Sequence, residues 1–206
     1  MHKPRLSITR LNLLLALLLS APAMATRLVE VSDSSGHPVE DAVVYAEPSQ
    51  SLGNNKPAAA EVEQKERKFM PLVTVVQTGA MVSFPNNDTV KHHAYSFSPA
   101  KSFELKLYSG RPSTPLLFDK AGTVIVGCNI HDQMVAYIHV VNTPYFAKTD
   151  SKGVASLPTL PAGKYTLKTW YYKQAPGSEA QQQSLNVGTD SASTATIVVK
   201  LNGKAA

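Results

Sequence analysis

The side chains best suited to bind a metal ion lie in GCNIHDQM, residues 127–134. This segment contains Cys128, the only cysteine of the chain, followed by His131 and Met134 at intervals of three residues. Thiolate, imidazole and thioether are soft or borderline ligands, and two imidazoles, one thiolate and a weak axial sulfur are typical of a copper site. The segment is one imidazole short of that set, so a second histidine must come from elsewhere in the chain.

Upstream, FPNNDTVKHHAYSF offers His92 and His93, and His92 precedes Cys128 by 36 residues (128 − 92). That separation suits a ligand delivered by another strand. Consecutive residues of a strand face opposite sides, so only one of the two can face the ion, and a register slip of one residue would exchange them. We predict His92 as the ligand, with His93 as the alternative.

Other chemistries fit these residues less well. A structural zinc site takes four ligands from Cys, His and carboxylates, and methionine is a poor zinc ligand. A Cys128 nucleophile would need an oriented base and would leave Met134 without a role. A chance grouping is a further alternative, because Cys and Met are common core residues. The sequence shows no paired acid and base and no Gly-rich phosphate loop, so we do not expect an enzyme.

The remaining candidate groups receive structural roles. We expect His37 and His139 to be structural or solvated rather than ligands. Asn87 and Asp88 are expected to shape the turn before the upstream histidine, since Asn and Asp side chains bond to nearby backbone groups.

The elements that position these residues are predicted to be strands, because short apolar runs alternate with Gly and Pro turns. One buried face is predicted for each of two segments, formed by Phe103, Leu105 and Leu107 in the first and by Val124, Val126 and Cys128 in the second. Only AEVEQKERKF, residues 60–69, has a spacing that could also suit a helix.

Residues 1–25 have the three parts of a secretory signal peptide: a basic head with Lys3, Arg5 and Arg10, a short apolar run, and a small-residue ending at Ala25. The apolar run is shorter than the roughly 20 residues that span a bilayer. We therefore predict cleavage after Ala25, export to the periplasm, and no transmembrane segment in the mature chain.

Charge and cysteine content narrow the function further. The chain has 20 Lys and Arg against 15 Asp and Glu, and removing the three basic residues of the leader leaves 17 against 15, a net charge of +2. Such a balance does not favour nucleic-acid binding, which needs a clustered basic face. A single unpaired cysteine is unusual in an exported protein, and either a bound metal or burial would protect it.

Taken together, FPNNDTVKHHAYSF and GTVIVGCNIHDQMVAYIHVV resemble the cupredoxins, the small blue copper proteins, and the Cys-x2-His-x2-Met spacing is that of the short-loop, amicyanin-like members. The wider sequence is similar to exported proteins labelled as methylamine utilisation proteins. The resemblance covers roughly residues 60–142 and implies a Greek-key β-sandwich. It also implies one copper ion cycling between Cu(I) and Cu(II), with His92 and His131 as equatorial ligands, Cys128 as the thiolate and Met134 as the axial ligand.

The chain departs from that pattern beside the first ligand. His93 stands where many cupredoxins have asparagine, and Lys91 stands where proline is common. Because hydrogen bonds around the sulfur tune a copper centre, the departure leaves the reduction potential open.

The flanking segments VSDSSGHPVEDAVVYAEP and KTDSKGVASLPTLPAGKYTLKTWYY are similar to carboxypeptidase regulatory-like, transthyretin-like sandwiches, which are not catalytic. They imply a second, discontinuous β-sandwich, and the alternative is a simple tail packed on the cupredoxin. The predicted fold class is thus all-β, with a signal peptide at 1–25, first strands and linker at 26–59, a cupredoxin domain at 60–142 and the remaining strands at 143–206. In that sandwich, Trp170, Tyr171 and Tyr172 are expected to pack in a core strand, with an aromatic binding patch as the alternative.

The function implied is a periplasmic carrier that shuttles single electrons between a donor and an acceptor redox protein. The alternatives are a copper carrier or sensor without redox cycling, and a non-catalytic β-sandwich binding module.

Overall fold

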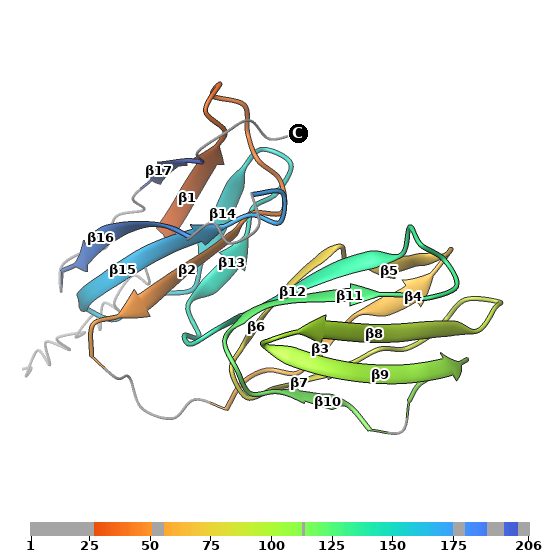
Figure 1. Ribbon diagram of the computed structural model, residues 1–206. Coiled ribbons are helices and arrows are strands. Elements are labelled where there is room, and N and C mark those ends of the chain that lie inside the picture. The colour runs from red at the N-terminus through yellow and green to blue at the C-terminus, as the bar shows by residue number, and fades with distance from the viewer. Residues whose placement is uncertain (1–26, 51–55, 113, 175–179, 189–195, 202–206) are drawn as a thin grey trace, which may run out of the picture.

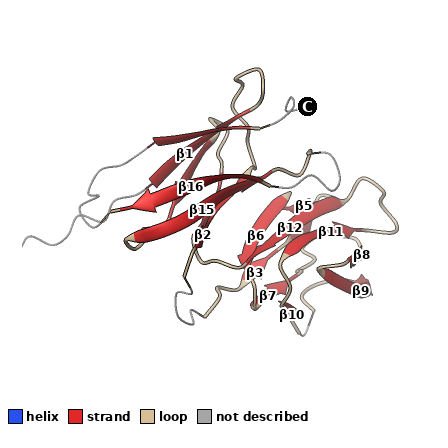
Figure 2. Ribbon diagram, turned by 60° about the vertical axis from the view of Figure 1, so that its left-hand side comes forward, coloured by secondary structure: helices blue, strands red, loops and turns tan. Residues whose placement is uncertain are grey.

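The computed structural model describes residues 27–50, 56–112, 114–174, 180–188 and 196–201. Within these residues the chain forms strands, turns and loops and no helix, which confirms the all-β fold class (Figures 1 and 2). No helix of the described residues is long and apolar enough to cross a membrane. The predicted signal peptide lies outside the described residues.

The middle of the chain forms one group of strands (the right-hand group in Figure 1). A five-stranded sheet has the order β6-β12-β11-β8-β9, and a three-stranded sheet has the order β10-β7-β3, with β4 and β5 forming a hairpin. The bounds are β3 Ala60–Glu61, β4 Glu63–Lys65, β5 Lys68–Met70, β6 Val73–Gln77, β7 Ala80–Ser83, β8 His92–Ser98, β9 Lys101–Tyr108, β10 Leu116–Phe118, β11 Gly122–Gly127 and β12 Val135–Val141.

These strands enclose a common core because alternate residues of each strand point inward. Val124 and Val126 of β11 are fully buried while Ile125 between them is half exposed, as the alternation predicts. Phe84, Phe118 and Ile138 fill the same core, and its cluster of buried side chains also includes Cys128 and Met134.

Strands from both ends of the described chain form the second group (Figure 1). One sheet has the order β14-β1-β17 and the other β13-β2-β15-β16, and side chains from both sheets share a second core. The bounds are β1 Arg27–Ser32, β2 Val43–Pro48, β13 Phe146–Lys148, β14 Val154–Leu157, β15 Gly163–Trp170, β16 Gln181–Val187 and β17 Thr196–Lys200.

The two sequence motifs of the flanking segments meet in this second group. The turn after β1 closes when Gly36 N donates to Asp33 O, and Gly153 of the later motif packs against Val31 O and Pro38. Thr149 lies buried between them, donating to Val39 O at 2.6 Å. Residues more than 100 positions apart therefore build one corner of the sandwich.

The two groups are joined by a cluster of apolar and aromatic side chains. Val73 and Val141, from β6 and β12, pack against Val43 and Tyr45 of β2. Beside them the His139 and Trp170 rings stack with centroids 4.5 Å apart and planes 10° apart. The outer face of the five-stranded sheet is thus covered along its β6–β12 edge by the second group.

Trp170, Tyr171 and Tyr172 lie in this packing rather than on an open patch. Tyr171 is buried in the second core, while Trp170 and Tyr172 are partly buried against the cluster between the groups. The aromatic binding patch considered from the sequence is therefore not formed.

One local expectation is wrong, and one left open by the sequence is decided. Residues 60–69, whose spacing could also suit a helix, form β3, β4 and the start of β5. Leu107 is 54% exposed, because the β8–β9 pairing shifts between His92 and Ala94, so that two residues of β9 oppose one of β8. This bulge turns Leu107 outward and Tyr108 inward.

Candidate metal centre

The loop that carries three of the predicted ligands connects β11 to β12. Strand β11 ends at Gly127, so Cys128 follows the last strand residue and Met134 precedes the first residue of β12. Met134 N donates to His131 O at 2.9 Å, which closes the loop into a turn. Cys128 continues the inward face of β11 and is 4% exposed.

Strand β8 brings the fourth residue to this loop. It runs antiparallel to β11, with Tyr95 opposite Gly127, so the start of β8 lies beside the residues that follow Gly127. His92 begins β8 and is fully buried. The antiparallel pairing therefore converts a separation of 36 residues into a contact with Cys128.

Ligand atoms of His92, Cys128 and His131 lie within 4.8 Å of one another. The two imidazole rings have centroids 5.0 Å apart and meet edge to face. Nitrogen and sulfur ligands lie about 2.0–2.3 Å from the ion in protein metal sites, so three ligand atoms this close together could converge on a single ion.

The hydrogen bonding of the two imidazoles supports that fit. His92 Nδ1 and His131 Nδ1 are buried and have no hydrogen-bond partner in the part of the chain that the structure describes. A buried polar atom without a partner costs about 1–3 kcal/mol, and native proteins rarely leave one without a reason. Both histidines belong to the group that gathers around Cys128, where a bound metal ion could supply the missing partner.

Met134 is 2% exposed and packs in the same core cluster as Cys128. The two residues also line one surface hollow of about 620 Å³, together with Tyr95, Phe97 and Asp132. Cys128 and Met134 therefore share both the core cluster and the lining of this hollow.

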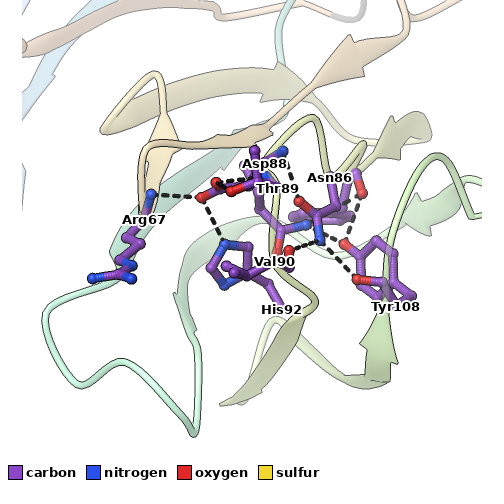
Figure 3. Close-up of polar contacts among 9 residues, drawn as sticks. Arg67, Asn86, Asp88, Thr89, Val90, His92 and Tyr108 are labelled. Carbon is purple, nitrogen blue, oxygen red and sulfur yellow. Dashed lines mark hydrogen bonds and ion pairs between the residues drawn. The ribbon is translucent and has the colours of Figure 1, made fainter.

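Asp88 contacts the ring of His92 (Figure 3). Its Oδ2 lies 2.9 Å from His92 Nε2, and Arg67 N donates to the same oxygen at 2.8 Å. The hydrogen bond from His92, followed by that from the Arg67 amide, holds the pKa of Asp88 well below its usual range. An ionised carboxylate only accepts hydrogen bonds, so Nε2 is the nitrogen of His92 engaged with Asp88, and the buried Nδ1, which has no partner among the described residues, is the nitrogen left for the site.

The other histidines lie elsewhere. His93 points to the opposite face of β8, where its Nε2 lies 3.1 Å from Glu104 Oε1 without hydrogen-bond geometry. His139 is buried between the two groups of strands, and His37 is exposed beside Asp33. The structure therefore brings His92, Cys128 and His131 together and leaves His93 outside.

Sequence reasoning missed two supporting features. One is the contact of Asp88 with His92, which the spacing of four residues in a loop does not reveal. The other is Tyr108, which donates to Phe84 O at 2.7 Å and accepts from Gln64. Burial, with a smaller contribution from Cys128, raises the pKa of Tyr108 to about 12, so its hydroxyl remains a donor next to the site.

Comparisons with known proteins place copper proteins among the solved structures that this chain resembles. A purple cupredoxin from Nitrosopumilus maritimus aligns with 19% identity and a TM-score of 0.36, covering 40% of this chain and 99% of that one. Amicyanin from Paracoccus versutus aligns with 16% identity and a TM-score of 0.35, covering 40% and 81%.

A copper-containing nitrite reductase from Thermus scotoductus aligns with 22% identity and a TM-score of 0.39, over 47% of this chain and only 26% of the reductase. No protein-family model matches the chain, and no curated protein matches it. At these scores the alignments do not assign the chain to a family.

Proposed function

We propose that this chain is a periplasmic type 1 copper protein that carries single electrons between two redox proteins. The observation that carries the proposal is the gathering of His92, Cys128 and His131 within 4.8 Å, with two buried imidazole nitrogens that lack hydrogen-bond partners among the described residues. Two imidazoles and one thiolate are the equatorial donor set of blue copper sites.

The donor set is completed by Met134, which we propose as the weak axial ligand. It is buried beside Cys128, on the loop that also holds His131. Zinc is less well served by this group, because a thioether is a poor zinc ligand. When bound, copper supplies a one-electron couple, Cu(II)/Cu(I).

The chain's own residues suit a carrier with little rearrangement. His92 is fixed by Asp88, the Cys128–Met134 turn is closed by a backbone hydrogen bond, and Cys128 is packed in the core. His131 is the least buried of the three gathered residues, so its ring edge is the proposed route for electrons to a partner. Partners are proposed to be redox proteins, and no substrate chemistry is assigned to the chain itself.

We further propose the domain division 26–59, 60–142 and 143–206 after removal of a signal peptide at 1–25. It is supported by the separate cores of the middle strands and of the strands from both ends of the described chain. In this proposal the middle is a cupredoxin domain, and the flanking strands form a non-catalytic, transthyretin-like sandwich.

The test is to produce the protein from the full chain and titrate it with Cu(II). An intense thiolate-to-copper absorption band in the visible range, bleached by ascorbate and restored by oxidant, is expected. Cys128→Ser and His131→Ala should abolish the band. His92→Ala should also abolish it, while the matched variant His93→Ala, one residue away on the other face of β8, should retain it.

Three results would contradict parts of the proposal. Tight Cu(I) binding with no stable Cu(II) form would favour a copper carrier or sensor without redox cycling. Loss of the band in His93→Ala with retention in His92→Ala would exchange the upstream ligand. No copper binding by the folded wild-type protein would leave a β-sandwich binding module.

A further inference from the structure

Asp88 holds His92 through a carboxylate whose two oxygens are both occupied. Oδ2 accepts from His92 Nε2 at 2.9 Å and from Arg67 N at 2.8 Å, and Oδ1 accepts from Thr89 N at 2.7 Å. Figure 3 shows Arg67 and His92 converging on one oxygen from two sides. The two backbone N–H groups therefore orient the carboxylate independently of its contact with the imidazole.

The loop that bears Asp88 is itself pinned. Asn86 Nδ2 donates to Val90 O at 3.0 Å and to Tyr108 O at 2.7 Å, which fixes the turn between them. Asn87 Nδ2 donates to Glu63 Oε1 at 2.9 Å, and this contact ties the same turn to β4. These bonds fix the loop on both sides of Asp88. The Asp88 carboxylate adds its own bonds to Thr89 N and Arg67 N, and the same group contacts His92.

The Arg67 amide reaches Asp88 at a cost in backbone strain. Glu66 and Arg67 form the two-residue turn between β4 and β5, with φ values of 52° and 56°. Such a turn normally takes Asn and Gly, because a residue with a Cβ in the left-handed region costs about 1–2 kcal/mol. Strain of this kind persists where the surroundings require it, and here it aims a backbone N–H at Asp88.

We propose that Asp88 is a positioning residue of the copper centre. Its carboxylate locks His92 with the proton on Nε2 and the lone pair of Nδ1 directed at Cys128 and His131. A carboxylate on the far nitrogen also makes an imidazole a stronger ligand, which favours Cu(II) over Cu(I). The second effect rests on the proposed function, while the lock on the tautomer exists in the protein without metal.

The first measurement needs no copper. In protein labelled with ¹⁵N-histidine, ring nitrogen shifts at about pH 8, where free imidazole is neutral, report the tautomer of His92. The wild type should show the Nε2–H form alone, and Asp88→Ala should show a mixture of both forms. A wild type with the proton on Nδ1, or an Asp88→Ala protein that keeps the wild-type tautomer, overturns the inference.

The second measurement compares copper affinities. Removal of an outer hydrogen-bond partner typically costs 10- to 100-fold in metal affinity, so Asp88→Ala should lose about that much for Cu(II). Asp88→Asn keeps an acceptor but loses the charge, and its ratio of Cu(II) to Cu(I) affinity should fall about tenfold. That change raises the reduction potential by about 59 mV. An unchanged ratio in Asp88→Asn contradicts the effect on ligand strength.

Two matched variants separate positioning from a general effect of mutation. Glu104→Gln alters the carboxylate beside His93, on the other face of β8, and should change neither the tautomer of His92 nor the affinity ratio. Replacing Glu66 and Arg67 by Asn and Gly relieves the turn but keeps the amide, and should also leave both unchanged. If either variant matches Asp88→Ala, the role of Asp88 is not specific and the inference fails.

Failure of the inference and failure of the proposed function are distinguishable. A wild-type protein that binds no copper but shows an Asp88-dependent tautomer overturns the function and retains the lock. If the protein binds copper but substitution of Asp88 changes neither the tautomer of His92 nor the ratio of Cu(II) to Cu(I) affinity, the proposed function stands and the inference is overturned. Should Asp88→Ala fail to fold, as judged by circular dichroism, Asp88→Asn decides the outcome through the affinity ratio.

Discussion

His139 should make the whole fold sensitive to mild acid. The ring is 7% exposed, stacks on Trp170 and lies 5.6 Å from the ring of Tyr45, and its Nδ1 contacts Thr123 Oγ1 at 3.1 Å. Burial lowers the pKa of His139 from 6.5 to about 4. Burial also raises the pKa of Tyr45 to about 12, so Tyr45 stays uncharged throughout the acid range.

The sign and size of the effect follow from these pKa values. Between pH 6.5 and about 4 the unfolded chain binds a proton at His139 that the folded chain does not, so stability falls as the pH falls. A pKa difference of one corresponds to about 1.4 kcal/mol, so the loss from this residue is about 3 kcal/mol. It begins near the unfolded pKa and is complete below the folded one.

The assay is chemical unfolding at a series of pH values, followed by the fluorescence of Trp170, the single tryptophan of the chain. His139→Phe keeps a flat ring against Trp170 but cannot be protonated. We expect the free energy of unfolding of the wild type to fall by about 3 kcal/mol more than that of His139→Phe between about pH 7 and pH 4. Subtracting the two proteins removes the contributions of groups that titrate in both.

Equal losses in the two proteins would refute the reasoning. In that case the imidazole must gain a compensating partner on protonation, or the interface must open before the protein unfolds. A larger loss of unfolding free energy in His139→Phe than in the wild type would show that folding does not favour the neutral form of His139.

Two further predictions concern the second core. Gly153→Ala should destabilise the fold by at least about 2 kcal/mol more than Gly36→Ala in thermal or chemical unfolding. Both glycines have positive φ. A Cβ at Gly153 would lie 2.5 Å from the backbone oxygen of Val31, whereas a Cβ at Gly36 would meet no atom of the described residues within 4 Å, so equal costs would contradict the clash. Thr149→Val should cost about 2–4 kcal/mol, because its hydroxyl satisfies a buried amide and a buried carbonyl. Thr166→Val on β15 should change the free energy of unfolding by no more than about 0.5 kcal/mol. Similar costs for the two variants would show that the hydrogen bonds of Thr149 are not the cause of its effect.

The alternation of residues was enough to predict the strands of the metal-binding group. Val124, Val126 and Cys128 share a buried face, as a period of two requires. The prediction failed at Leu107 because a bulge interrupts the period, and a bulge depends on the neighbouring strand rather than on the local sequence. The sequence of residues 60–69 did not decide between helix and strand. These residues form strands because they pair with neighbouring strands, and that pairing is not visible in the local sequence.

The sequence alone could predict the proposed metal ligands, because it shows their residue types and their spacing. Cys128, His131 and Met134 are local, and His92 could be proposed as the strand-borne partner. The contact of Asp88 with His92 could not be predicted from the sequence. It depends on the backbone amide of Arg67, which is positioned by the β4–β5 hairpin. The packing of His139 against Trp170 likewise depends on two strands from opposite groups meeting face to face.

The way β1 and β2 find their partners has a consequence for biogenesis. The middle strands can close on one another within a continuous stretch, but β1 pairs with β14 and β17, and β2 with β13 and β15. Such distant pairing is slow, because the entropy of closing the long loop is lost before the strand contacts that compensate for it can form. A chain cut short after β12 would therefore present two unpaired strand edges, and would be expected to aggregate even with its metal-binding half correctly formed.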